Sequence, residues 1–155
     1  MYVMDTSSFI VMGHYFPERF PSFWVQLNAL ADQDLLVSVS EVWKELENRS
    51  TRSHLANWLD TRKALFTEPS PEEMQFVREI FAVSSFQSLV RRRSILEGSP
   101  VADPWVIARA AILSGCVVTE EADREDTVRI PAVCRHFDVD CTTLEGMMQR
   151  ERWQY

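Results

Sequence analysis

Short apolar runs alternate with longer stretches of helical periodicity along the chain. The apolar runs are rich in Val and Leu and are bounded by polar turns, as at 35–40 and 116–119. Runs of this kind predict buried β-strands. We predict strands at 2–5, 35–40, 65–67, 116–119 and 139–142.

Between these runs, apolar residues recur at the spacing of one helix face. Phe23, Trp24, Leu27 and Leu30, for example, share a face behind a proline that suits a first helical turn. We predict helices at 21–31, 54–65, 130–134 and 144–152, one or two helices within 72–97, and helices that start at 41 and 101.

Two helix ends carry a recognisable terminal residue. Ser40 is predicted to cap the helix that starts at Glu41, and Gly115 to end the helix that starts at Val101. Strands that alternate with amphipathic helices predict an α/β protein with a parallel sheet covered on both faces. We therefore expect a three-layer α/β/α sandwich with a central, mainly parallel sheet of four to five strands. No linker interrupts the pattern, so residues 1–155 are predicted to form a single domain.

The composition excludes several classes of protein. With 46% hydrophobic residues and 4 Gly, the chain is neither disordered nor collagen-like. No apolar run is long enough to span a membrane, and Asp5 follows the start too closely for a secretion signal. The cysteines, Cys116, Cys134 and Cys141, form no C-x-x-C pair, which favours free thiols in a reducing cytosol. We expect a cytoplasmic protein.

The net charge of −7 argues against one class of partner. Proteins that wrap duplex DNA without sequence preference are usually basic, whereas this chain has 16 Lys and Arg against 23 Asp and Glu. The acidic excess instead raises the question of whether some carboxylates are gathered for a purpose.

Acidic residues follow the predicted strands. Asp5 closes the first strand, Glu41 and Glu45 come one helical turn apart after the second, and Glu121 follows the fourth. Asp103 lies at the first turn of a predicted helix. In open parallel sheets, ligands gather outside the carboxyl ends of the strands. These acids are therefore expected to meet at one edge of the sheet.

Each acid also has a purely structural interpretation. Asp103, which precedes a proline, suits a helix N-cap, and Glu41 and Glu45 suit an exposed helix face. The acids within 120–126 suit a solvated loop. Asp5 is the hardest to explain this way, because an acid that closes an apolar strand lies near the core, where an unpaired charge is costly.

Gathered carboxylates predict a particular cation. They repel one another until a proton or a cation neutralises them, and hard oxygen ligands in an incomplete cage favour Mg²⁺ or Mn²⁺. Zinc is disfavoured, because His14, His54 and His136 lack the spacing of zinc ligands. The sequence leaves open whether one or two ions bind.

With these acids, the chain resembles a known family, the PIN-domain ribonucleases, which include VapC-like toxins. The segments MDTSSF, SVSEVWKEL, ADPWVIARA and VVTEEA resemble the four acidic motifs of that family, in the same order. Within it, the Trp58–Leu59 pair and the segment IPAVC at 130–134 resemble a prokaryotic branch of unknown function (DUF4411-like). The resemblance covers nearly the whole chain.

The resemblance implies which residues bind metal. Asp5, Glu45, Asp103 and Glu121 match the four acids of the motifs, and they would be both the catalytic residues and the ligands of Mg²⁺ or Mn²⁺. Glu121 departs from the usual Asp. Second choices are Glu41, Asp123 and Asp126, and the supporting hydroxyls are those of Thr6, Ser7 and Thr119.

The resemblance also implies an activity and partners. Family members hydrolyse RNA phosphodiesters with a metal-activated water, and many are toxins that form homodimers and are inhibited by an antitoxin protein. The main alternative is an inactive PIN-like module that acts as a scaffold. The Glu at position 121, where the family usually has Asp, is the reason to consider it. Candidate phosphate contacts are Arg49, Arg52, Arg62, Lys63 and Arg91–Arg93.

Overall fold

The computed structural model describes residues 1–49, 51–89, 101–124 and 128–154. Its centre is a parallel sheet with the strand order β3-β2-β1-β4-β5. The strands are β1 (Tyr2–Met4), β2 (Leu36–Val39), β3 (Phe66–Thr67), β4 (Cys116–Val118) and β5 (Asp140–Thr142). The prediction of a parallel sheet with four to five strands is confirmed.

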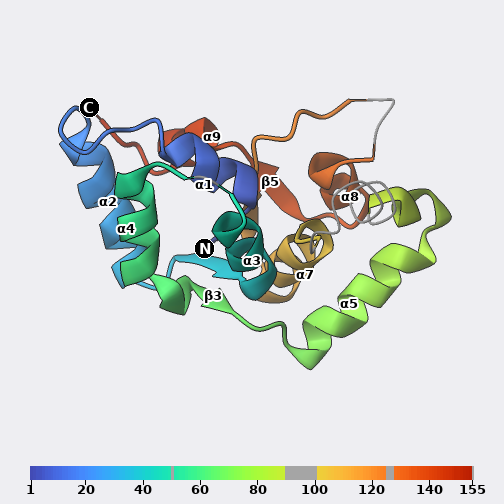
Figure 1. Cartoon of the computed structure of the whole chain (residues 1–155). Helices are drawn as coiled ribbons and strands as arrows, with labels where there is room; N and C mark the ends of the chain where they lie inside the picture. The colour runs from blue at the N-terminus through green and yellow to red at the C-terminus, as the bar shows by residue number, and fades with distance from the viewer. Residues whose placement is uncertain (50, 90–100, 125–127, 155) are drawn as a thin grey trace.

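Helices cover both faces of this sheet, which gives the predicted three-layer α/β/α sandwich (Figure 1). They are α1 (Thr6–Met12), α2 (Pro21–Asp32), α3 (Ser40–Glu47), α4 (Ser53–Thr61), α5 (Pro71–Ala82), α7 (Asp103–Leu113), α8 (Ile130–His136) and α9 (Leu144–Arg150). Helix α7 packs against β1, β2 and β4, while α2 packs against β2 and α9 against β5. No helix in the described ranges is long and apolar enough to cross a membrane.

Strand β1 is the centre of the sheet and of the core. Val3 pairs with Val37 on one side and with Val117 on the other, and Val3 and Met4 are fully buried. The sheet grows outward from β1 through β2 on one side and β4 on the other, so the topological switch point lies between β1 and β4. Ligands of open α/β sheets bind at such a point, outside the carboxyl ends of the strands.

In the described ranges, four helices end on a left-handed residue that is not glycine. Each such residue has φ between 50° and 56°, and the next N–H donates to a carbonyl five residues back, as in a Schellman motif. The four residues are Asp34, Ser114, Asp138 and Arg152. The prediction that Gly115 ends its helix is wrong by one position, because Ser114 takes the left-handed conformation and Gly115 follows it.

Two further boundaries differ from the prediction. Ser40 does not cap α3: the helix begins at Ser40 itself, and its hydroxyl donates to Glu41 and Glu68 instead. The helix predicted at 54–65 ends at Thr61, and a 3₁₀ turn covers Lys63–Leu65. The candidate residues Arg91–Arg93 and Asp126 lie outside the described residues.

A buried ion pair joins the ends of β2 and β3 to the helices. The Arg109 guanidinium on α7 donates to both carboxylate oxygens of Glu73, at 2.7 and 2.9 Å. It also donates to the Ser38 carbonyl at 2.6 Å and to the Glu68 carbonyl at 3.0 Å. Glu73 in turn forms a capping box with Ser70 at the start of α5. One side chain therefore fixes β2, β3, α5 and α7 relative to one another.

Candidate active site

Asp5 lies where β1 ends and α1 begins, at the switch point of the sheet. It is the N-cap of α1, and its Oδ2 accepts hydrogen bonds from the Ser7 N–H (3.3 Å) and the Ser7 hydroxyl (2.6 Å). The Thr119 hydroxyl, just after β4, donates to the same oxygen at 3.0 Å. Asp5 thus links the carboxyl ends of the two strands that flank the switch point.

The second oxygen of Asp5 has no such support. Oδ1 is buried, and no hydrogen-bond partner for it lies among the residues that the structure describes. Buried carboxylate oxygens are normally satisfied by donors or by a cation. This oxygen is therefore suited to binding a cation.

Glu45 reaches this edge of the sheet from α3. Its Oε2 accepts a hydrogen bond from the Thr6 hydroxyl at 2.6 Å, and its Oε1 accepts one from the Ala102 N–H at 3.1 Å. The carboxylate therefore bridges the residue after Asp5 and the residue before Asp103. The second-choice ligand on this helix, Glu41, pairs with Ser40 and Lys44 instead.

Asp103 is the first residue of α7. The N-cap of this helix is Ala102, so the interpretation of Asp103 as the cap is wrong. Asp103 is only 3% exposed, as is Asp5, and Glu45 is 6% exposed. The positive end of the helix dipole favours a carboxylate at this position.

Asp5, Glu45 and Asp103 are thus three buried acids that short contacts bring to one edge of the sheet. In the described part of the chain, no Lys, Arg or His forms an ion pair with Asp5 or Glu45. Burial of a charge without a counter-charge is costly, and a divalent cation would lower that cost. The side chains do not converge fully, because no group of three or more possible metal ligands is close enough to hold an ion in the described ranges.

The acids after β4 bind partners outside the group of three buried acids. Glu121 Oε2 accepts a hydrogen bond from the Ile130 N–H at the start of α8, at 3.0 Å. Glu120 Oε1 accepts one from the Leu144 N–H at the start of α9, at 2.7 Å. Asp123 forms an ion pair with Arg135 on α8. The backbone N–H of Glu121 still donates to the Thr119 hydroxyl, so Glu121 borders the site.

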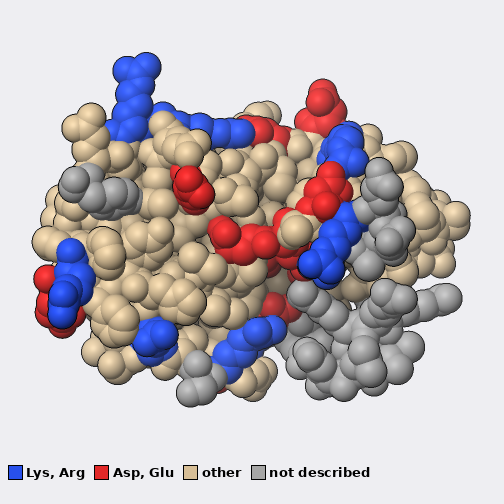
Figure 2. All heavy atoms as spheres, turned by 90° about the horizontal axis from the view of Figure 1, so that it is seen from above, with Lys and Arg blue, Asp and Glu red and all other residues tan. Residues whose placement is uncertain are grey.

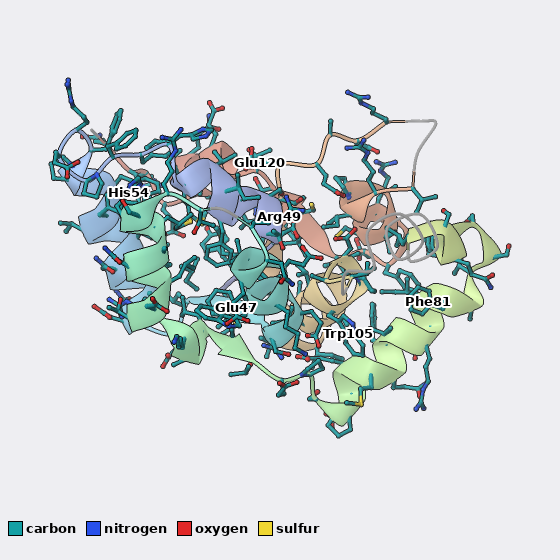
Figure 3. All side chains as sticks on the ribbon, viewed as in Figure 1. Glu47, Arg49, His54, Phe81, Trp105 and Glu120 are labelled. Carbon is teal, nitrogen blue, oxygen red and sulfur yellow. The ribbon has the colours of Figure 1, made fainter. Side chains whose placement is uncertain are left out.

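A cationic pocket lies at the opposite end of α1 from Asp5. It has a volume of about 350 Å³, and His14, Arg49 and Arg52 line it together with Gly13 and Thr51. Arg49 lies just beyond α3 (Figure 3), and the Arg52 guanidinium lies 5.1 Å from the Phe16 ring centroid. No carboxylate in the described residues pairs with Arg49 or Arg52. By contrast, Arg62 and Lys63 pair with Asp32 and Asp60.

Comparison with known proteins gives a family and a similar fold. Residues 2–155 match the model of a family described as a domain of unknown function, DUF4411. No curated protein matches the chain. The crystal structure of FitAcB from Neisseria gonorrhoeae is similar, with a TM-score of 0.50 and 14% sequence identity, over 91% of this chain and 96% of that chain. At this identity the likeness shows a shared fold.

Proposed function

The chain belongs to the DUF4411 family, and from that premise we propose that it is a PIN-like endoribonuclease that depends on Mg²⁺ or Mn²⁺. The observation that carries the proposal is the set of three buried acids, Asp5, Glu45 and Asp103, at the carboxyl edge of a parallel sheet. Their oxygens are the donors that these two ions prefer.

Each residue of the site has a proposed task. Asp5, Glu45 and Asp103 would hold the cation, and Ser7 and Thr119 fix the Asp5 carboxylate through its Oδ2. Thr6 fixes Glu45 in the same way. A bound divalent ion lowers the pKa of a coordinated water and neutralises charge on the phosphate.

Glu121 is the proposed fourth acid. It lies beyond Thr119 and can act on a second ion or on the attacking water. One of its oxygens is already bound to the Ile130 N–H, so its task is secondary to that of the three buried acids.

The cationic pocket supports RNA as the substrate. From Asp5 to Gly13, α1 rises about 12 Å, at 1.5 Å per residue. In a stacked strand this length corresponds to roughly three to four nucleotides. A strand whose scissile phosphate lies at Asp5 would therefore place a later phosphate near Arg49 and Arg52. Figure 2 shows a face on which acidic side chains gather centrally and Lys and Arg side chains lie around them.

The PIN-like resemblance extends the proposal to partners. The protein would be the toxin of a toxin–antitoxin pair, with an antitoxin protein as inhibitor, and would form a homodimer in the cytoplasm. Sedimentation of the purified chain tests the dimer. Loss of colony formation by cells in which expression of the protein is induced tests whether it is a toxin.

Cleavage of end-labelled single-stranded RNA tests the activity. We expect cutting with Mn²⁺, none with EDTA, and a loss of at least about 100-fold in Asp5→Asn and Asp103→Asn, because each removes a ligand charge from the ion that stabilises the transition state. Glu41→Gln is the matched control, since Glu41 pairs with Ser40 and Lys44 away from the site, and should cleave as the unchanged protein does.

The other outcomes discriminate between the alternatives. Cleavage by Asp5→Asn at the unchanged rate would mean that the proposed site is wrong. A folded protein that binds Mn²⁺ in calorimetry but cuts no test RNA has a narrow substrate. A folded protein that neither binds Mn²⁺ nor cuts RNA would be the inactive scaffold.

A further inference from the structure

Two of the three cysteines lie in one cavity beside the candidate site. Cys134 on α8 and Cys141 on β5 line a cavity of about 490 Å³, together with Thr119, Glu121 and Val139. Cys116, on β4, is absent from this lining and is buried. The three thiols are all free.

The end of α8 explains why the two thiols meet. Asp138 adopts the left-handed conformation, and the Val139 N–H donates to the Cys134 carbonyl at 2.8 Å. The chain therefore doubles back onto Cys134. Cys141, on β5, lines the same cavity as Val139. A Schellman motif thus brings a helix thiol and a strand thiol together.

The two thiols differ in access and in reactivity. Cys134 is 1% exposed, whereas Cys141 is partly exposed. The neighbouring Cys134 thiol lowers the pKa of Cys141, so the proton stays on Cys134. Burial raises the pKa of Cys116 to about 12, so Cys116 stays a protonated thiol. The thiolate is the form that reacts with oxidants.

We propose that Cys134 and Cys141 form a redox-active dithiol that hydrogen peroxide or another small hydroperoxide oxidises to a disulfide. The Cys141 thiolate attacks one peroxide oxygen, which forms an S–O bond, breaks the O–O bond and releases hydroxide. Cys134 then attacks the Cys141 sulfur, which forms the S–S bond and breaks the S–O bond. The hydroxide that this S–O cleavage releases takes the Cys134 proton and leaves as water. Sulfur is oxidised and the peroxide is reduced.

This site does not depend on the proposed nuclease activity. It nevertheless borders the candidate site, because Glu121 lines the same cavity and binds the Ile130 N–H at the start of α8. A disulfide would tether α8, one turn after Ile130, to strand β5.

Peptide mapping of the peroxide-treated chain tests the proposal. The reduced full-length chain is treated with one equivalent of hydrogen peroxide, its remaining thiols are alkylated, and it is digested without reductant for mass spectrometry. We expect a Cys134–Cys141 linkage in most molecules and an alkylated Cys116. Cys116→Ser is the matched control and should form the same linkage. In Cys134→Ser, a 1,3-dione probe should trap sulfenic acid on Cys141.

Three results would overturn the proposal. They are three titratable thiols after treatment, a linkage that contains Cys116, and a sulfenic acid on Cys141 that persists in the unchanged protein. If Cys134→Ser does not fold by circular dichroism, the unchanged protein and Cys116→Ser decide the matter by themselves.

Discussion

The hydrogen bonds of Asp5 are unevenly shared between its two oxygens, and this asymmetry separates its structural from its chemical role. Oδ2 takes all three donors and also caps α1, while Oδ1 has none among the described residues. An asparagine can keep its carbonyl oxygen at the Oδ2 position and lose only the charge. An alanine loses the cap as well.

Variants at Asp5 should therefore differ in stability. We expect Asp5→Asn to keep the free energy of unfolding within about 1 kcal/mol, while Asp5→Ala lowers it by about 1–2 kcal/mol through loss of the N-cap. Urea unfolding followed by circular dichroism measures both. Equal stability of the two variants would show that the capping contacts contribute nothing.

Glu121 is expected to matter less than the buried acids. In Glu121→Gln the amide oxygen can still accept from the Ile130 N–H, so α8 should keep its start. We expect RNA cleavage to fall less than about tenfold, against at least about 100-fold for Asp5→Asn, because Glu121 holds no buried ligand position. Parallel rate measurements on one RNA compare the two. An equal loss would make Glu121 a full ligand.

The sequence predicts some of these residues better than others. The positions of Asp5, Glu45 and Asp103 after strands or at a helix start are local features, and the structure brings all three to one edge of the sheet. Glu120 and Glu121 bind the starts of α9 and α8, which are tertiary contacts that no local pattern reveals.

At the scale of elements, the ends of the helices were harder to predict than the helices themselves. Glycine is the residue expected at a left-handed helix end, as for Gly115. With 4 glycines in the chain, four helices instead end on Asp, Ser or Arg. The pairing of Arg109 with Glu73, 36 residues away, is a tertiary contact that the sequence does not reveal either, because Arg109 lies in an otherwise apolar helix pattern.

The end of α7 offers a stabilising change. Ser114 has φ 50°, a conformation that costs residues with a Cβ about 1–2 kcal/mol and costs glycine almost nothing. Part of this gain is offset by the greater freedom of glycine in the unfolded chain. We expect Ser114→Gly to raise the free energy of unfolding by about 0.5–1 kcal/mol in urea titrations. The control is Ser114→Ala, which should bring no such gain. A loss of stability in Ser114→Gly would contradict the left-handed conformation of Ser114.

The Arg109–Glu73 pair should be essential for the packing of four elements. Arg109→Met leaves a buried carboxylate and two carbonyls without their donor, so we expect a loss of about 3–5 kcal/mol in the free energy of unfolding. Arg62→Met is the control: its partner Asp32 is 62% exposed, so the loss should stay below about 1 kcal/mol. Similar losses in both would refute a special role for Arg109. If Arg109→Met does not fold, Arg109→Lys supplies the comparison.

At the scale of the whole molecule, an acidic protein is proposed to bind an acidic polymer. The net charge of −7 disfavours long-range attraction to RNA, so binding must depend on local cation sites. Arg49 and Arg52 are the described arginines best placed for this, since both line the pocket at the far end of α1.

The salt dependence of RNA binding tests that pocket. For single strands, the slope of log K against log salt falls by about 0.7 for each phosphate contact removed. In an Asp5→Asn background that prevents cleavage, we expect the double change Arg49→Ala and Arg52→Ala to reduce the slope by about 1.4. Fluorescence anisotropy over a salt series measures it. Arg62→Ala, whose guanidinium pairs with Asp32, should leave the slope unchanged, and an unchanged slope in the double variant would exclude the pocket.

The strand order has a consequence for synthesis of the protein. Strand β1 pairs with β2 and with β4, yet Tyr2 and its β4 partner Cys116 are 114 residues apart. At about 5–20 residues per second, a ribosome needs roughly 6 to 23 s to make that length. During this time the central strand has one neighbour and one open apolar edge, which is a template for pairing with another chain. The yield of folded protein will therefore depend on how fast the segment between β3 and β4 is translated and on whether a chaperone covers β1 meanwhile.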